Sequence, residues 1–150
     1  MHATEFVQNS AAAAGASEIP PVVVMAGKED LLKQQCLAAI ATSVLGADSD
    51  EMLQRVDGQQ AAWRDVNDEL ATRSMFSTHR VVLVERAEEF IKKNRGILED
   101  YVSQPAQHSV LVLETRSWPG NTKLAKAVTR AGLTLECTEL EGAALTKWLV

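Results

Sequence analysis

The residues best placed to do chemistry in this sequence are Gly27 and Lys28, which follow a run of aliphatic residues. A glycine and a lysine in this position are typical of a loop that wraps nucleotide phosphates. Such a loop also needs a glycine five positions earlier and a hydroxyl after the lysine to hold magnesium. Val22 and Glu29 occupy these two positions, and the Glu29 carboxylate would repel phosphate. We therefore interpret Gly27 and Lys28 as a degenerate phosphate loop, a tight turn with a solvated lysine.

A working nucleoside triphosphatase also needs an acidic pair that holds its metal ion. The aliphatic run 81–84 is followed instead by Glu85 and Arg86, and the arginine places positive charge where magnesium would bind. Glu88 and Glu89 come next, and we expect them to compensate the dipole of a helix that begins there. The sequence offers no recognisable set of nucleophile, base and orienting group.

Cysteine and histidine are too scattered to suggest a metal site or a redox pair. Cys36 and Cys137 lie far apart in the chain, and neither has a second ligand beside it. His2, His79 and His108 show no spacing typical of zinc ligands. We expect two reduced, packed thiols, no metal and no cofactor.

The composition is that of one ordinary globular domain. The chain has 150 residues, of which 46% are hydrophobic and 23% charged. Its formal net charge of -5 argues against a nucleic-acid surface as the main function, so DNA contact should be secondary at most. The start of the chain lacks a signal peptide, and no apolar run approaches the roughly 18 residues that span a membrane. We expect a disordered tail over residues 1–20, no membrane contact and a cytoplasmic protein.

Aliphatic strands alternate with amphipathic helices five times along the chain. This alternation predicts an α/β fold in which helices cover both faces of a parallel sheet, a three-layer sandwich with right-handed crossovers. Asn121 is predicted to cap the fourth helix, and Gly96 to weaken the third. The second strand also fits one more helical turn. The strands are expected at 22–25, 52–56, 81–84, 109–113 and 133–137, and the helices at 29–45, 59–73, 87–104, 122–131 and 140–150.

The chain changes from helix to buried strand between Ala71 and Glu85. The uninterrupted aliphatic run 81–84 is typical of a central strand covered on both faces. Just before it, Met75 and Phe76 stand in a polar turn, where large apolar side chains need something to pack against. From the residues alone, they pack either on the protein's own core, which is the commoner outcome, or on a partner.

Five short segments carry a resemblance to a known family. They are Gly-Lys-Glu-Asp-Leu-Leu at 27–32, Leu-Ala-Thr-Arg-Ser-Met-Phe-Ser at 70–77, Arg-Val-Val-Leu-Val-Glu at 80–85, Leu-Val-Leu-Glu at 111–114 and Lys-Leu at 123–124. In order and spacing, the chain resembles the N-terminal domain of the delta subunit of bacterial DNA polymerase III over residues 21–149. That family implies a clamp-loader subunit with an AAA+ fold, of the P-loop NTPase type, and without ATPase activity.

The resemblance also implies a partner and a binding site. Met75 and Phe76 would insert into a hydrophobic pocket of the sliding clamp, the beta subunit, and the domain would open the ring. Ser74 and Ser77 would belong to the polar rim of this clamp-binding site. Met75 stands where the family more often has leucine, and an unbranched thioether adapts to such a pocket.

The family further implies that residues 21–150 are the first domain of a longer chain. Its lid and collar domains, absent here, would join the other clamp-loader subunits. We expect this domain to be non-catalytic within the polymerase III holoenzyme. Two alternatives stay open, a small nucleotide-binding NTPase with an irregular phosphate loop and another noncatalytic clamp-loader subunit.

Two further features have no assigned role. The basic residues Lys92, Lys93 and Arg95 are expected on a solvated helix face, although they could face DNA or a neighbouring subunit. The segment 118–120 (Trp-Pro-Gly) is expected to be a turn rather than a substrate platform.

Overall fold

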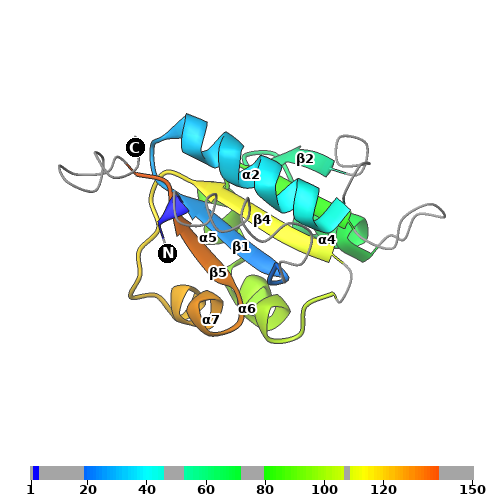
Figure 1. Ribbon diagram of the computed structural model, residues 1–150. Helices are drawn as coiled ribbons and strands as arrows, with labels where there is room; N and C mark the ends of the chain where they lie inside the picture. The colour runs from blue at the N-terminus through cyan, green and yellow to red at the C-terminus, as the bar shows by residue number, and fades with distance from the viewer. Residues whose placement is uncertain (1, 4–18, 46–52, 72–79, 107–108, 139–150) are drawn as a thin grey trace, which may run out of the picture.

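A single parallel sheet organises the chain (Figure 1). The computed structural model describes residues 2–3, 19–45, 53–71, 80–106 and 109–138. Within these ranges the strands lie in the order β2-β3-β4-β1-β5, and every pair of neighbours is parallel. The strands are β1 (Val22–Ala26), β2 (Leu53–Asp57), β3 (Arg80–Glu85), β4 (Ser109–Thr115) and β5 (Leu133–Glu136). All five match strands that the sequence predicts.

The direction of the connections explains which face each helix covers. From β1 the chain crosses to β2 at one edge of the sheet, and the later connections run back in the opposite direction. Because parallel crossovers are right-handed, this reversal moves the later helices to the other face. Figure 1 shows α2 (Asp30–Leu45) running across one face of the sheet. The other face packs against α4 (Trp63–Ala71), α5 (Glu88–Lys93), α6 (Arg95–Ser103) and α7 (Lys123–Ala131).

Alternate strand residues therefore enter two separate core layers. Val82 and Val84 of β3 pack with α4 to α7. Val81 and Leu83 of the same strand pack in the layer beneath α2. Each of these four side chains is almost fully removed from water, as the uninterrupted aliphatic run predicts for a central strand. The expected three-layer α/β sandwich is confirmed.

The structure corrects two predictions about the helices. The single helix expected at 87–104 is two helices, because the chain turns at Asn94, whose side-chain amide donates a hydrogen bond to the carbonyl of Phe90. The helix α7 is capped by Thr122 and not by Asn121. The Thr122 hydroxyl accepts the backbone N–H of Ala125 at 3.0 Å. The helix predicted at 140–150 lies outside the described residues.

The two cysteines meet in the layer beneath α2. Cys36 and Cys137 are both buried and free, as expected for reduced thiols. A hydrogen-bond contact with Cys137, together with burial, raises the pKa of the Cys36 thiol. Sequence spacing gave no sign that the two side chains would be neighbours.

The beginning of the chain touches the edge of the sheet. His2 forms a parallel bridge with Glu136, its Nε2 lies 2.9 Å from the carbonyl of Thr138, and Ala3 is fully buried. Residues 4–18 lie outside the described ranges, so the tail expected over residues 1–20 stays a prediction. Within the described ranges, no helix combines the length and the apolar character needed to cross a bilayer.

Candidate functional site

The loop after β1 is closed by backbone hydrogen bonds. Residues 27–29 alone connect β1 to α2. The Gly27 N–H donates to the carbonyl of Thr115 at 3.1 Å, and the Glu29 N–H donates to the carbonyl of Cys137 at 3.0 Å. Two amides that a phosphate loop would turn toward its ligand are thus engaged by the ends of β4 and β5.

Backbone conformation and close packing require a glycine at position 27. Its φ of +137° is rarely adopted by residues with a side chain. A Cβ at this position would lie 2.1 Å from the carbonyl oxygen of Cys137. The glycine therefore serves close packing of the loop against the residue after β5, whereas the neighbouring Lys28 is exposed.

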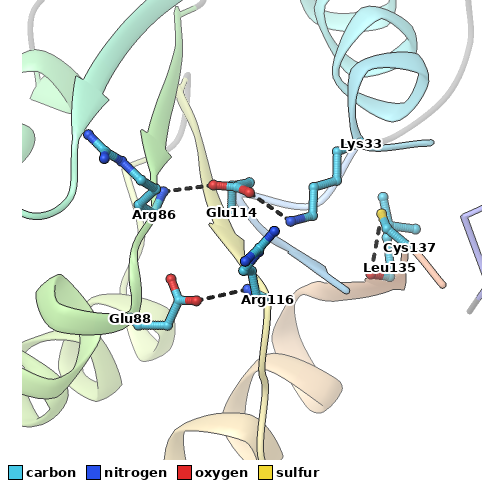
Figure 2. A network of polar contacts seen from close by, with 7 residues as sticks. All are labelled: Lys33, Arg86, Glu88, Glu114, Arg116, Leu135 and Cys137. Atoms are coloured by element: carbon cyan, nitrogen blue, oxygen red, sulfur yellow. Dashed lines mark hydrogen bonds and ion pairs between the residues drawn. The ribbon is translucent and has the colours of Figure 1, made fainter. Parts of the chain in front are cut away.

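A buried ion pair lies beside this loop, at the carboxyl ends of the strands. Lys33, in the first turns of α2, is only 4% exposed, and its Nζ lies 2.7 Å from Oε1 of Glu114 on β4. Figure 2 shows that the second carboxylate oxygen of Glu114 accepts the backbone N–H of Arg86, at 2.7 Å. Burial alone would raise the pKa of Glu114, but the hydrogen bonds from Arg86 and Lys33 outweigh it, and the pKa is lowered.

The residues after β3 continue this network of polar contacts. Arg86 has a positive φ of 52°, and its guanidinium donates to Oδ2 of Asp57 at the end of β2, at 2.7 Å. The Glu88 carboxylate accepts the backbone N–H of Arg116 at 2.9 Å (Figure 2). The positive charge that the sequence places at the expected metal position is therefore paired with Asp57, and Glu88 joins α5 to the segment after β4.

At the carboxyl edge of the sheet, the usual ligand site of such folds, Lys33 is thus paired with Glu114 and Arg86 with Asp57. Beside Lys33 and Glu114 lies a hollow of about 300 Å³. In the part of the chain that the structure describes, no three histidine, cysteine, aspartate or glutamate side chains form a group that could hold a metal ion.

At the opposite edge of the sheet, two contacts hold residues that flank the segment 72–79. Glu69 near the end of α4 forms an ion pair with Arg80 at the start of β3. The Ser109 hydroxyl, at the start of β4, donates to the carbonyl of Leu70. These contacts fix the residues on both sides of the segment at the edge where strands begin.

The predicted clamp-binding residues belong to that segment. Ser74, Met75, Phe76 and Ser77 all lie outside the described residues. Gly27 and Lys28 are the predicted site residues that the structure describes. Their role as a degenerate phosphate loop stays a prediction. The backbone hydrogen bonds of the loop and the buried ion pair beside it are the observations relevant to this prediction.

Sequence reasoning missed Lys33 and Glu114, although a signal was present. Lys33 falls on the apolar stripe of α2 with Cys36, Leu37 and Ile40, where an unpaired charge would be costly. Glu114 interrupts the aliphatic run of its strand near the carboxyl end. A lysine on a buried helix face and a glutamate at the end of a buried strand together suggest an ion pair.

Comparison with known proteins gives three results. A family model described as "DNA polymerase III, delta subunit" matches residues 24–138. The solved structure of the Bacillus subtilis DNA clamp loader delta protein (YqeN) is 25% identical in sequence and superimposes with a TM-score of 0.80. The match covers 96% of this chain and 46% of that protein, so the chain spans less than half the length of that relative. No curated protein matches the chain at a significant level.

Proposed function

Because this chain belongs to the DNA polymerase III delta subunit family, we propose that it is a noncatalytic clamp-loader domain that binds the sliding clamp and opens its ring during DNA replication. The domain has an AAA+ type of fold with a degenerate phosphate loop. Its partner is the beta subunit, the clamp of DNA polymerase III. Assembly with other clamp-loader subunits is part of the same proposal, and the chain covers 46% of the Bacillus subtilis delta protein that it resembles.

The observation that carries the noncatalytic part of this proposal is the Lys33–Glu114 ion pair. Lys33, in the first turn of α2 beside the loop, is buried against a carboxylate 2.7 Å away and is not free to meet phosphate charge, whereas Lys28 in the loop itself is exposed. The loop next to it uses its Gly27 and Glu29 amides within the sheet. Phosphate would have to break these contacts before it could bind. Breaking the buried ion pair would cost several kcal/mol.

The clamp-binding part rests on Met75 and Phe76, with Ser74 and Ser77 as the polar rim. Interfaces concentrate their energy in a few large apolar side chains surrounded by polar residues, and this short segment has that composition. The anchored ends of the segment support the proposal, because a binding loop on a fixed base loses less conformational freedom when it binds. The Glu69–Arg80 ion pair is one of the two contacts that supply this base.

Ring opening then needs no ATP at this subunit. A domain that binds an open or strained clamp interface more tightly than the closed one shifts the clamp toward the open state by that difference in affinity. Two anchors worth about 2 kcal/mol each would bias such an equilibrium by several hundredfold if both engaged the open state alone.

The proposal is tested by gel filtration of the chain with purified sliding clamp. We expect the two to co-elute, and the Met75→Ala/Phe76→Ala variant to elute separately. A matched control is Leu31→Ala/Ile97→Ala, which removes the two large apolar side chains that the described surface exposes, at 65% and 45%. Co-elution of the first variant, or its loss in the control, would contradict the assignment of the clamp-binding residues.

A further inference from the structure

A second pocket brings together the two sequence features that the proposed function leaves unused. It lies between α5, the start of α6 and the segment that joins β4 to α7, and it has a volume of about 390 Å³. Ile91, Trp118 and Leu124 form its apolar lining, and Lys92 and Arg95 lie at its rim. We call it the tryptophan pocket. Its volume falls within the roughly 300–1,000 Å³ range of sites that bind small ligands or side chains.

The apolar lining belongs to the core and is therefore rigid. Ile91 and Leu124 are buried members of the layer beneath α4 to α7, and the half-buried Trp118 packs against the same layer. An indole held in this way presents a fixed apolar wall, which an incoming side chain can cover without ordering it first.

The charge around the tryptophan pocket favours an anion. Lys92 and Arg95 are exposed, and neither takes part in an ion pair among the described residues. Glu88 also lines the pocket, but its carboxylate already accepts the N–H of Arg116. Thr122, the N-cap of α7, lies at the same pocket, so the positive end of that helix dipole adds to the two cations.

We infer that the tryptophan pocket binds a peptide segment of a partner protein in which a large apolar side chain stands beside one or two carboxylates. The apolar lining receives the side chain, and Lys92 and Arg95 receive the carboxylates. Two cations match two carboxylates, whereas a nucleic-acid strand needs a longer row of positive charge. The chain's net charge of -5 also disfavours a polyanion.

This contact is separate from the clamp-binding site. The segment that bears Trp118 follows the carboxyl end of β4, whereas Ala71 and Arg80 flank the clamp-binding segment at the edge where the strands begin. A partner peptide could therefore occupy the tryptophan pocket while the clamp is bound.

Fluorescence anisotropy with the 150-residue chain tests this inference. The probe is a labelled five-residue peptide with a central phenylalanine, one aspartate on each side of it and a glycine at each end, and we expect a Kd below about 1 mM. The same peptide with asparagines in place of the aspartates should bind at least about fivefold more weakly, since each charge pair is worth up to about 1 kcal/mol.

A matched pair of variants locates the site. Lys92→Glu should weaken binding of the acidic peptide at least about fivefold, while Lys93→Glu should leave it unchanged. Both lysines are exposed on α5, both changes alter the net charge equally, and Lys93 does not line the pocket. Clamp co-elution should be the same for both variants.

Four results would overturn the inference. They are no binding at about 1 mM peptide, equal affinity for the asparagine peptide, equal loss in the two lysine variants, and tighter binding of an eight-nucleotide oligothymidine than of the acidic peptide. The last result would assign the pocket to single-stranded nucleic acid instead.

Discussion

The buried ion pair between Lys33 and Glu114 can be tested by replacing each residue with an uncharged one of similar shape. Lys33→Met removes the ammonium and keeps the length of the side chain. Glu114→Gln removes the charge and keeps an oxygen that can accept the Arg86 N–H. The double variant removes both charges and leaves neither unpaired.

The expected costs follow from burial. Glu114→Gln leaves the Lys33 ammonium, whose side chain is 5% exposed, without a counter-charge, and should lower the free energy of unfolding by about 3 kcal/mol. Lys33→Met leaves a carboxylate that is 19% exposed and still bonded to Arg86, and should cost about 2 kcal/mol. Because a buried pair can often be replaced by uncharged groups at little cost, the double variant should lose only about 2 kcal/mol. The two residues are thus coupled by about 3 kcal/mol.

Urea unfolding at pH 7, followed by tryptophan fluorescence, measures these free energies. Lys93→Met is the control, because it removes an exposed lysine and should change the free energy of unfolding by less than about 0.5 kcal/mol. If the double variant loses the sum of the two single losses, within about 0.5 kcal/mol, the charges do not stabilise one another. The inference that Lys33 and Glu114 form a stabilising buried ion pair would then be refuted.

Three further predictions concern the cap, the loop and the pH dependence. Thr122→Ala should lower the free energy of unfolding by about 1 kcal/mol and Asn121→Ala by much less, and equal effects in urea unfolding would contradict the assigned cap. Gly27→Ala should prevent stable folding, because its Cβ would meet a backbone carbonyl at 2.1 Å, whereas Gly96→Ala in α6 has open space and should raise the thermal midpoint slightly. The pKa of Glu114 is lowered in the folded state, so this residue stabilises the fold above its ordinary value of 4.5 and the contribution is lost as the pH falls below that value. In Glu114→Gln, the free energy of unfolding should fall less steeply as the pH is lowered. A pH profile equal to that of the unchanged chain would contradict the lowered pKa of Glu114.

The fold could be predicted because its signals are local and repeated. The aliphatic run 81–84 has no polar interruption and is rich in valine, which favours a strand covered on both faces. The alternation of strands and helices then fixes a parallel sheet, and the handedness of crossovers places the helices. Details decided by single side chains were harder to predict. Asn121 and Thr122 are both good caps by type, and only the local backbone decides between them.

The site was less predictable, because its contacts join residues that are distant in sequence. Glu114 meets Lys33 and Arg86 only when β1, β3 and β4 are in register, and no local pattern encodes that register. The interpretation of the loop rests on the types of the residues at positions 22 and 29, and it stays a prediction. The contact between Lys33 and Glu114 beside this loop had to be seen in three dimensions.

The central claim is that this domain binds the clamp through Met75 and Phe76 and needs no nucleotide of its own. Isothermal titration of purified sliding clamp with the chain, with and without magnesium and ATP, tests it most directly. We predict the same Kd in both conditions and an affinity at least about 100-fold lower for Met75→Ala/Phe76→Ala. A Kd that changes with ATP, or one that the double variant leaves unaltered, would contradict the claim.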